Sequence, residues 1–299
     1  MSSSVEVYIL KIRDKEFDFA KRTYIMGILN ATPDSFSDGG QHFHLEEAVM
    51  HAKRMIEEGA DIIDVGGEST RPGFQYISAE EEIERVVPVI REIRKFSDIP
   101  ISVDTTKSEV FEASYEAGAD IINDVSGFLL DKKMGELAAK LGVVSILMHD
   151  GFYFNDSKIS NDTVNMSLLM EKSTDPKQYT LEVLAELKVI ADGAKLYGVS
   201  ADKIILDPGI GFGKTLKQNL ILLHEMDKME LTGYPILLGC SRKSVIGKSL
   251  DLPVDERLEG TITTSVLAAK ANVGIVRVHD VKENLRAIKM YEAIRNSMI

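Results

Sequence analysis

The sequence predicts a single-domain α/β protein with the (β/α)8 architecture of TIM barrels, in which eight strand-then-helix units close one parallel sheet. Two observations indicate this fold class. Short β-branched runs alternate with longer segments of helical period, and eight such units fall between residues 23 and 296. The runs are apolar nearly throughout, which is typical of parallel strands buried on both faces. An open doubly wound sheet is the alternative, but it has no need of eight equivalent units.

The predicted elements follow one another in the order that this barrel requires. The predicted strands span residues 23–29, 61–65, 101–104, 120–124, 143–148, 203–207, 235–239 and 274–278. The predicted helices span residues 45–58, 79–96, 108–117, 132–141, 179–197, 216–229, 255–271 and 281–296. Within 79–96 the apolar side chains recur at spacings of three and four, and the acidic run at 80–82 is expected to be a solvated face.

The connecting segments carry further signals. Gly-Ala-Asp occurs at 59–61 and at 118–120, each time between a helix and the next strand, where glycine is a natural helix C-cap. The repeat indicates one loop chemistry used twice. We expect residues 1–20 to form a small hairpin over the barrel floor, so that one domain spans 1–299 and the barrel proper about 23–296. Residues 149–177 are too long for an ordinary connection, and we interpret them either as a mobile loop at the working face or as a tolerated insertion.

Composition excludes several classes of protein. With 47 acidic and 35 basic residues the chain has a net charge of −12, which is unfavourable for binding nucleic acid. The one cysteine, Cys240, cannot form an internal disulfide. The longest uncharged run, at about 231–241, is far shorter than the roughly 20 residues that span a bilayer, and residues 1–11 lack the pattern of a signal peptide. We therefore expect a cytoplasmic enzyme or small-molecule binder, without nucleic-acid or membrane partners.

Polar residues gather where the predicted strands end. In a (β/α)8 barrel the carboxyl ends of the strands and the loops that follow them build the active site. Seven of the eight predicted strands end in a carboxylate, an amide or a cation, and this concentration predicts a site there. The residues at these ends are Asn30, Asp64, Asp104, Asn123 with Asp124, Met148 with His149, Asp207, Ser241 to Lys243, and Arg277 with His279.

Three of these residues suit a heterocyclic ligand. Asp104 and Asp207 accept hydrogen bonds when ionised, and the amide of Asn123 both donates and accepts. Together they fit a ring that carries an amino group, N–H donors and a carbonyl. The alternative is that each carboxylate caps the following helix, as Asp104 would before Thr105. For the three residues together we favour ligand binding.

Two loops add an aromatic side chain and anion-binding groups. Residues 30–40 consist of turn-forming types, but Phe36 among them indicates a lid over a flat ligand. In residues 66–73 adjacent glycines allow the backbone to approach a ligand, and Thr70 and Arg71 suit an anion. The alternative reading of the second loop is a glycine-rich turn with a surface arginine.

The segment at 207–215 resembles two nucleotide-binding motifs and matches neither. A phosphate-binding loop needs glycine where Pro208 stands, and a dinucleotide fingerprint needs glycine where Lys214 stands. We interpret it as a loop whose glycines leave room for a ligand ring beside Asp207, with Phe212 against a second ring.

The last two strands supply positive charge. Lys243, Arg277 and His279 would form an anion site after strands seven and eight, where barrels often bind phosphate. Salt bridges to neighbouring acids are the alternative, and this alternative is more plausible for Arg277 than for Lys243. The other histidines show no spacing typical of zinc ligands.

These motifs, taken in order, resemble those of the dihydropteroate synthases. The similarity runs from about residue 23 to residue 290. It rests on Met-Gly-Ile-Leu-Asn-Ala-Thr-Pro-Asp-Ser-Phe-Ser-Asp-Gly-Gly at 26–40, Gly-Gly-Glu-Ser-Thr-Arg-Pro-Gly at 66–73, Asp-Pro-Gly-Ile-Gly-Phe-Gly-Lys at 207–214, Ser-Arg-Lys-Ser at 241–244 and Arg-Val-His-Asp at 277–280. The resemblance implies a (β/α)8 barrel that condenses a dihydropterin carrying a hydroxymethyl pyrophosphate with 4-aminobenzoate, giving dihydropteroate and pyrophosphate for folate biosynthesis. It also implies a homodimer and a target for sulfonamides.

The resemblance implies a role for each matching residue. Asp104, Asn123, Met148, Asp207 and Lys243 would hold the pterin, and Asn30 would meet Mg²⁺ bound to pyrophosphate. Thr70, Arg71, Arg277 and His279 would surround the anion. Phe36, Pro72, Phe212 and Ser244 would shape the aminobenzoate site, with Asp38, Asp104 and Lys243 acting at the reacting centre.

Two other functions fit part of the pattern. A pterin-binding methyltransferase that passes a methyl group to a corrinoid shares the pterin contacts, but it has no use for the loop at 30–40 or for Ser-Arg-Lys. A pterin-binding protein that has lost catalysis is the second alternative, although every motif position carries a competent residue. The segment after His149 lacks the arginine-bearing loop of the family, which bears on aminobenzoate affinity and substrate order. The expected chemistry is a dissociative substitution that pyrophosphate release drives.

Overall fold

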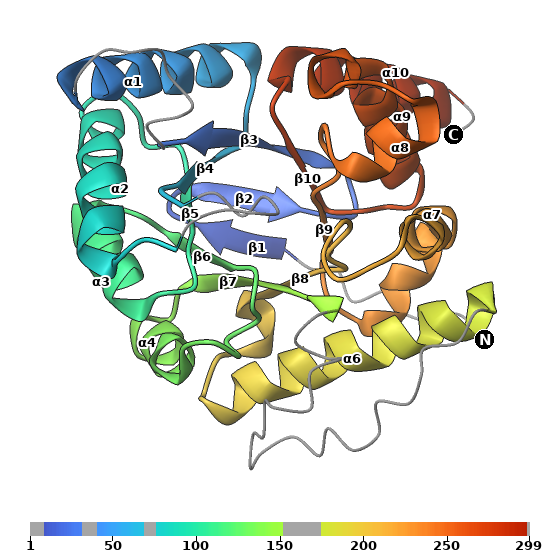
Figure 1. The fold of residues 1–299 in the computed structure, drawn as a ribbon, viewed down its shortest axis with the longest axis horizontal. Coiled ribbons are helices and arrows are strands. Elements are labelled where there is room, and N and C mark those ends of the chain that lie inside the picture. Colours follow the sequence, from blue (N-terminus) through green and yellow to red (C-terminus); the bar gives the residue numbers. More distant parts are fainter. Residues whose placement is uncertain (1–8, 32–40, 69–75, 152–174, 298–299) are drawn as a thin grey trace.

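The computed structural model describes residues 9–31, 41–68, 76–151 and 175–297. Eight strands form one parallel sheet in the order β8-β7-β6-β5-β4-β3-β10-β9, and an isolated bridge between Leu206 and Ile236 joins its two edges. Helices surround the strands (Figure 1). The (β/α)8 architecture is therefore confirmed. The sheet strands are β3 (Tyr24–Asn30), β4 (Ile62–Gly66), β5 (Ile101–Asp104), β6 (Ile121–Asp124), β7 (Val144–Met148), β8 (Ile204–Asp207), β9 (Leu237–Leu238) and β10 (Ile275–Val278).

The helices agree with the sequence except in the last third of the chain. The predicted helix at 216–229 is α7 followed by a 3-10 segment at Met226–Thr232, and a 3-10 turn at Val254–Glu256 precedes α9. Helix α8 was not predicted, because its seven residues are too few to show a helical period. The helices are α1 (Gln41–Glu58), α2 (Ala79–Arg94), α3 (Ser108–Ala117), α4 (Lys132–Leu141), α6 (Pro176–Leu196), α7 (Leu216–His224), α8 (Ser244–Leu250), α9 (Leu258–Lys270) and α10 (Val281–Asn296). None of the helices in the described ranges combines the length and apolar character needed to cross a membrane.

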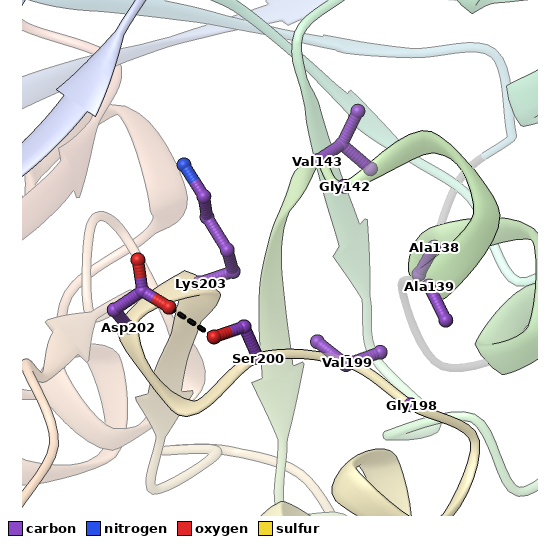
Figure 2. Close-up of a pocket in the computed structure, with 9 residues that line it drawn as sticks. All are labelled: Ala138, Ala139, Gly142, Val143, Gly198, Val199, Ser200, Asp202 and Lys203. Carbon is purple, nitrogen blue, oxygen red and sulfur yellow. Dashed lines mark hydrogen bonds between the residues drawn. The ribbon is translucent and has the colours of Figure 1, made fainter.

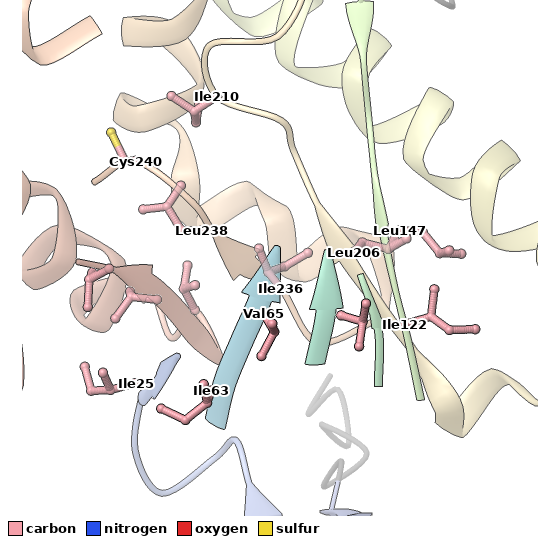
Figure 3. Packing of buried hydrophobic residues seen from close by; sticks show 14 of the residues in the cluster. Ile25, Ile63, Val65, Ile122, Leu147, Leu206, Ile210, Ile236, Leu238 and Cys240 are labelled. Carbon is pink, nitrogen blue, oxygen red and sulfur yellow. The ribbon is translucent and has the colours of Figure 1, made fainter. Parts of the chain in front are cut away.

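The apolar residues of the strands serve two cores. Alternate residues of β3 show the division, since Met26 points into the barrel and Ile25 packs outward against the helices. Figure 3 shows part of the outer core, where Ile63, Val65 and Leu206 lie between strands and helices. Because both faces are buried, the strands are apolar throughout, as predicted.

A hairpin closes the amino end of the barrel, which we call the floor. Strands β1 (Ile9–Ile12) and β2 (Lys15–Asp18) pair antiparallel, and Leu10, Ile12 and Phe17 complete the inner core. The expected hairpin is therefore confirmed in its described part. It leaves the carboxyl ends of the strands, which we call the rim, for the site.

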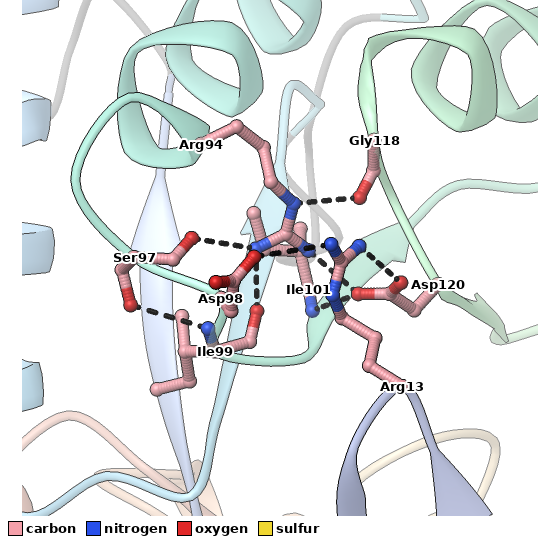
Figure 4. Close-up of polar contacts among 8 residues, drawn as sticks. All are labelled: Arg13, Arg94, Ser97, Asp98, Ile99, Ile101, Gly118 and Asp120. Carbon is pink, nitrogen blue, oxygen red and sulfur yellow. Dashed lines mark hydrogen bonds and ion pairs between the residues drawn. The ribbon is translucent and has the colours of Figure 1, made fainter.

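The two Gly-Ala-Asp sequences make equivalent loops at the floor. Asp120 Oδ2 accepts the backbone N–H of Ile101 at 2.9 Å, and Asp61 Oδ2 accepts that of Ile25 at the same distance. Each aspartate also pairs with an arginine at 2.6 Å, Arg94 for Asp120 and Arg22, two residues before β3, for Asp61. Figure 4 shows the Asp120 cluster with Arg13 of the hairpin turn. The prediction of one loop chemistry used twice is confirmed.

A small hollow lies at the floor between the ends of two helices. It is lined by the C-terminal turn of α4, the residues before β7 and the segment from Gly198 to Lys203 that leads into β8 (Figure 2). Within it Ser200 donates a hydrogen bond to Asp202. The hollow contains none of the residues expected at the rim, so it is separate from the candidate site.

Candidate active site

Sheet register brings the strand-end residues side by side at the rim. Asn30 lies opposite Gly66, Gly66 opposite Asp104, and Asp104 opposite Asn123, so one row crosses four strands. Met148 lies opposite Asp207 on the next pair. The row at the rim is therefore set by strand pairing alone, and Gly66 leaves the space beside Asp104 open, since an added Cβ would sit 3.6 Å from that residue's own Cβ.

One network joins Asp104 and Asn123, two of the three residues expected to hold a heterocycle. Arg277 donates from Nε to Asp64 Oδ2 and from Nη2 to Asp104 Oδ2, both at 2.6 Å. Asn123 Nδ2 donates to Asp64 at 3.2 Å. The other oxygen of Asp104, Oδ1, is buried without a hydrogen-bond partner among the described residues. A ligand N–H placed there would remove the cost of this unsatisfied acceptor.

Burial controls the protonation of these groups. Desolvation raises the pKa of Asp104 to about 7. The positive charge of Arg277 opposes this rise, whereas the nearby negative charges of Asp64 and Glu82 add to it. Burial likewise raises the pKa of Asp207, against the attraction of Lys243. For Arg277 burial lowers the pKa, but the two paired aspartates outweigh it, and the net direction is upward. The arginine therefore stays charged while Asp104 titrates near neutrality.

Lys243 and Asp207 face the same small volume beside Gly239. A Cβ added at Gly239 would lie 3.6 Å from Asp207 Oδ2 and 3.7 Å from Lys243 Nζ. Lys243 Nζ donates to the carbonyl of Ile210 at 2.6 Å and lies 4.5 Å from the centre of the Phe212 ring. Burial lowers the pKa of Lys243. The structure thus brings Lys243 together with Asp207 and Phe212, which belong to a different segment of the chain.

His279 is oriented by the segment that carries Lys243. Ser241 Oγ accepts the backbone N–H of His279 at 3.2 Å and lies 2.9 Å from its Nδ1. Arg242 holds Asp280, the next residue, through a two-pronged ion pair. Ser244, the first residue of α8, is exposed beside this segment. The last two strand ends therefore form one connected unit at the rim.

The helix-capping alternative does not describe the site aspartates. Helix α3 begins after Lys107 without a side-chain cap, and Asp131 rather than Asp104 binds its first N–H. Helix α7 is capped by Thr215. Asp207 instead binds the N–H of Gly209 at 2.7 Å within its own loop. The ion-pair alternative for Arg277 is observed, with both of its partners inside the site.

Two strand-end residues serve the scaffold instead of the site. Asp124 accepts hydrogen bonds from Ser126 and from the N–H of Phe128, which fixes the turn after β6, and burial raises its pKa to about 6. His149 is fully buried, with Nε2 2.5 Å from Glu186 on α6.

The expectation of a solvated acidic face at 80–82 is wrong for Glu82. Its side chain is fully buried and pairs with Lys107 at 2.6 Å, because the last acid of the run lies on the buried face of α2. Lys107 also binds Glu68, the residue that precedes the anion-binding part of its loop. Desolvation raises the pKa of Glu82. This ion network anchors the described start of the loop at 66–73.

Asp64 is the central residue that sequence reasoning did not assign. It was noted at a strand end, but its roles depend on Arg277 and Asn123, which are distant in the chain. The available signal was a carboxylate within an otherwise apolar strand, Ile62–Gly66. Five residues given roles lie outside the described residues: Phe36, Asp38, Thr70, Arg71 and Pro72.

The fold, with polar groups gathered at the carboxyl ends of the strands, is typical of an enzyme of the (β/α)8-barrel class. The sequence matches the pterin-binding enzyme family over residues 26–279. It is 51% identical to the dihydropteroate synthase of Clostridium beijerinckii over 286 residues, covering 95% of this chain and 99% of that protein.

Solved structures give the same result. The dihydropteroate synthase of Clostridium difficile, solved in the presence of pteroic acid, is 47% identical and superposes with a TM-score of 0.82 over 93% of this chain and 98% of that one. The Xanthomonas albilineans enzyme with 4-aminobenzoic acid is 36% identical, with a TM-score of 0.84 over 97% and 98%. The chain belongs to the pterin-binding enzymes and, within them, to the dihydropteroate synthases, which are transferases of folate biosynthesis.

Proposed function

We propose that this dihydropteroate synthase joins 6-hydroxymethyl-7,8-dihydropterin pyrophosphate to 4-aminobenzoate by dissociative substitution, with the residue roles given below. The observation that carries the proposal is the buried Oδ1 of Asp104, which has no hydrogen-bond partner in the part of the chain that the structure describes and lies in a row of groups that match a pterin edge. The second support is the ligand named for each of the two solved relatives, pteroic acid and 4-aminobenzoic acid.

The pterin is held edge-on by Asp104, Asn123 and Asp207, with Met148 as a buried wall and Lys243 above Asp207. Ring N–H and amino groups donate to the two carboxylates, and these bonds favour the ionised form of Asp104. Binding therefore supplies a donor for the buried Oδ1 of Asp104, which has no hydrogen-bond partner among the described residues. Arg277 keeps the carboxylate of Asp104 aimed at the ring through Nη2.

The pyrophosphate is bound by Thr70, Arg71, Arg277 and His279. Ser241 Oγ accepts the backbone N–H of His279 and lies 2.9 Å from its Nδ1, and we propose that the hydroxyl donates to Nδ1, which places the ring proton on Nε2. An imidazole in this form donates to an anion without needing a positive charge. Arg277 contributes its fixed charge next to the pterin carboxylates.

Mg²⁺ is the metal that we propose for this site, with Asn30 as its protein ligand. Mg²⁺ is commonly held by one or two protein oxygens together with substrate phosphates. The described residues contain no group of three or more His, Cys, Asp or Glu that would hold a metal by themselves, and Asn30 lies at the rim end of β3, so the donor set fits this mode. When bound, the ion neutralises charge on the departing pyrophosphate.

The substitution begins with cleavage of the C–O bond, whose electrons leave with pyrophosphate. The methylene cation that remains is conjugated with the electron-rich pterin, and the arylamine nitrogen then attacks it and loses a proton. Phe36, Pro72, Phe212 and Ser244 frame the aminobenzoate, and Asp38 positions the reacting centre. Exclusion of water from this site protects the cation. Sulfonamides, as aminobenzoate analogues, would occupy the same frame.

We also propose that two copies associate through the packed pair α9 and α10. Leu267 on α9 and Met290 and Ile294 on α10 are between 44% and 62% exposed. A cytoplasmic location stays a prediction from composition.

Product formation tests the proposal directly. The protein, the pterin pyrophosphate, Mg²⁺ and 4-aminobenzoate are incubated, and dihydropteroate is measured; we expect product from the wild type and loss in Asp104→Ala and Lys243→Ala. Absence of product from the wild type, or full activity in both variants, would overturn the assignment or its site. Pterin binding without pyrophosphate release would favour a non-catalytic binder, and methyl transfer from a folate would favour the corrinoid alternative. Slow pyrophosphate release in a single turnover without aminobenzoate supports dissociation, and none would favour concerted attack.

A further inference from the structure

Lys214 stands where its motif resembles the end of a phosphate-binding loop, but the structure gives its ammonium group a different partner. Nζ donates to the carbonyl oxygens of Gly209 at 2.9 Å and of His149 and Phe212 at 3.0 Å. A phosphate loop turns backbone N–H groups toward an anion. Here backbone carbonyls converge on a cation, so the charge of Lys214 is engaged by the protein itself.

The carbonyls converge because two loops are pressed together. A Cβ added at Gly209 would lie 1.9 Å from the carbonyl oxygen of His149, and one at Gly151 would lie 2.5 Å from that of Gly213. The N–H of His149 also donates to the carbonyl of Asp207 at 2.9 Å. Only glycine fits at these contacts, and the three carbonyl dipoles would repel one another without a cation between them.

Both loops carry residues of the proposed site. Asp207 and Phe212 belong to the loop after β8, and Met148 immediately precedes His149 at the end of β7. The same loop supplies the carbonyl of Ile210 that accepts from Lys243. A change in the spacing of the loops would therefore move groups on both sides of the pocket.

We propose that Lys214 is a positioning residue that holds the loops after β7 and β8 together. It thereby fixes the positions of Asp207, Met148 and Phe212 for the binding of pterin and aminobenzoate. The inference rests on the proposed function, because it assigns these three residues to the substrates. Lys214 touches neither substrate and acts through the carbonyls that it binds.

The clamp has an electrostatic consequence for Asp207. The charged groups around that carboxylate are Lys243 ahead of α8, Lys214 in its own loop and Arg277 on β10, and all three oppose the upward effect of burial on its pKa. The Cys240 thiol lies nearby, and burial raises its pKa. Removing the charge of Lys214 raises the pKa of Asp207 further, so the ionised form that binds the pterin is lost at a higher pH.

The test is direct titration with 6-hydroxymethylpterin from pH 5.5 to 9, comparing wild type, Lys214→Met and Lys214→Arg. Lys217→Met, an exposed lysine three residues later on α7, is the matched control. We expect Lys214→Met to bind about tenfold more weakly at neutral pH, with the acid limb of the binding curve moved to higher pH. Lys214→Arg keeps the positive charge, so its acid limb should lie at the same pH as in the wild type. Its affinity should stay below that of the wild type, because a guanidinium group does not reproduce the three carbonyl contacts. The control variant matches the wild type.

Unchanged affinity and an unchanged acid limb in Lys214→Met would overturn the inference. If Lys214→Met does not fold, Lys214→Arg decides, because an affinity equal to the wild type would show that the three-carbonyl geometry is not needed. A wild type that binds the pterin but forms no dihydropteroate would overturn the proposed reaction alone. A wild type that binds no pterin would overturn both.

Discussion

Asp120 at the floor of the barrel and Asp104 at the rim have opposite hydrogen-bonding states. At the floor, Asp120 accepts hydrogen bonds on both oxygens, from Arg13 on one and from Arg94 and the N–H of Ile101 on the other. At the rim, Asp104 has one oxygen paired with Arg277 and the other buried without a described partner. The same residue type is thus saturated at one end and left incomplete at the other.

This difference in hydrogen bonding distinguishes a residue that stabilises the fold from a residue that is kept ready to bind a ligand. A carboxylate with all its acceptors filled contributes to folding, whereas a buried carboxylate with an open acceptor is costly until a ligand arrives. The raised pKa of Asp104 reflects the free-energy cost of keeping this carboxylate charged, because burial disfavours the ionised form. Rim substitutions should therefore reduce activity without reducing stability, and floor substitutions should do the reverse.

The largest expected effect is on catalysis at the rim. Asp104→Asn keeps the shape of the side chain but replaces an ionised acceptor by a neutral amide facing the pterin. We expect kcat/KM to fall about a hundredfold, the value of a charge-assisted hydrogen bond in a buried site. The thermal midpoint should stay the same or rise, because a poorly solvated charge is removed. Steady-state kinetics and calorimetry on one preparation check both; wild-type activity, or a large loss of stability, would contradict the comparison.

The next effect is on stability at the floor. Asp120→Asn leaves Arg94, which is 12% exposed, with a neutral partner and weakens the contact with Arg13. We expect the free energy of unfolding to fall by about 2 kcal/mol, with kcat/KM within about twofold of the wild type. Urea unfolding and the activity assay measure the two quantities. The equivalent substitution Asp61→Asn serves as a second floor variant with only one arginine partner and a smaller expected loss. A floor variant that kept its stability and lost activity would contradict the distinction between the floor and the rim.

Local sequence patterns were enough for most of the fold. The strand at 101–104 and the helices at 108–117, 132–141 and 281–296 were predicted to the residue, because each is an apolar or amphipathic run bounded by turn residues. Strand β9 is shorter than predicted, since only Leu237 and Leu238 pair with β10 and the bridge from Ile236 completes the closure. The hydrophobic pattern of the sequence indicates which residues are buried, but it does not indicate which backbone groups form hydrogen bonds between strands.

The site was predictable where a residue's place on its own strand decides its role. Asp104 and Asp207 end buried parallel strands and Asn123 is the next-to-last residue of another, so strand direction alone brings them to the rim. Asp64 and Glu82 could not be assigned, because the role of each is set by a partner from another unit: Arg277 for Asp64 and Lys107 for Glu82. The fold brings such pairs together only when the barrel closes and the helices pack.

The pH dependence of stability sharpens the same contrast. An aspartate in the unfolded chain titrates near pH 3.9, whereas burial raises the pKa of Asp104 to about 7. Between these values the folded protein holds a proton that unfolding releases, so this group makes the free energy of unfolding fall as pH rises toward 7, by at most about 1.4 kcal/mol per pH unit. Urea unfolding at pH 5, 6 and 7 should show this fall in the wild type and in Asp120→Asn, and a weaker one in Asp104→Asn. Equal pH dependence in all three proteins would mean that the incomplete rim carboxylate carries no cost in the folded state, and the distinction between rim and floor would then rest on geometry alone.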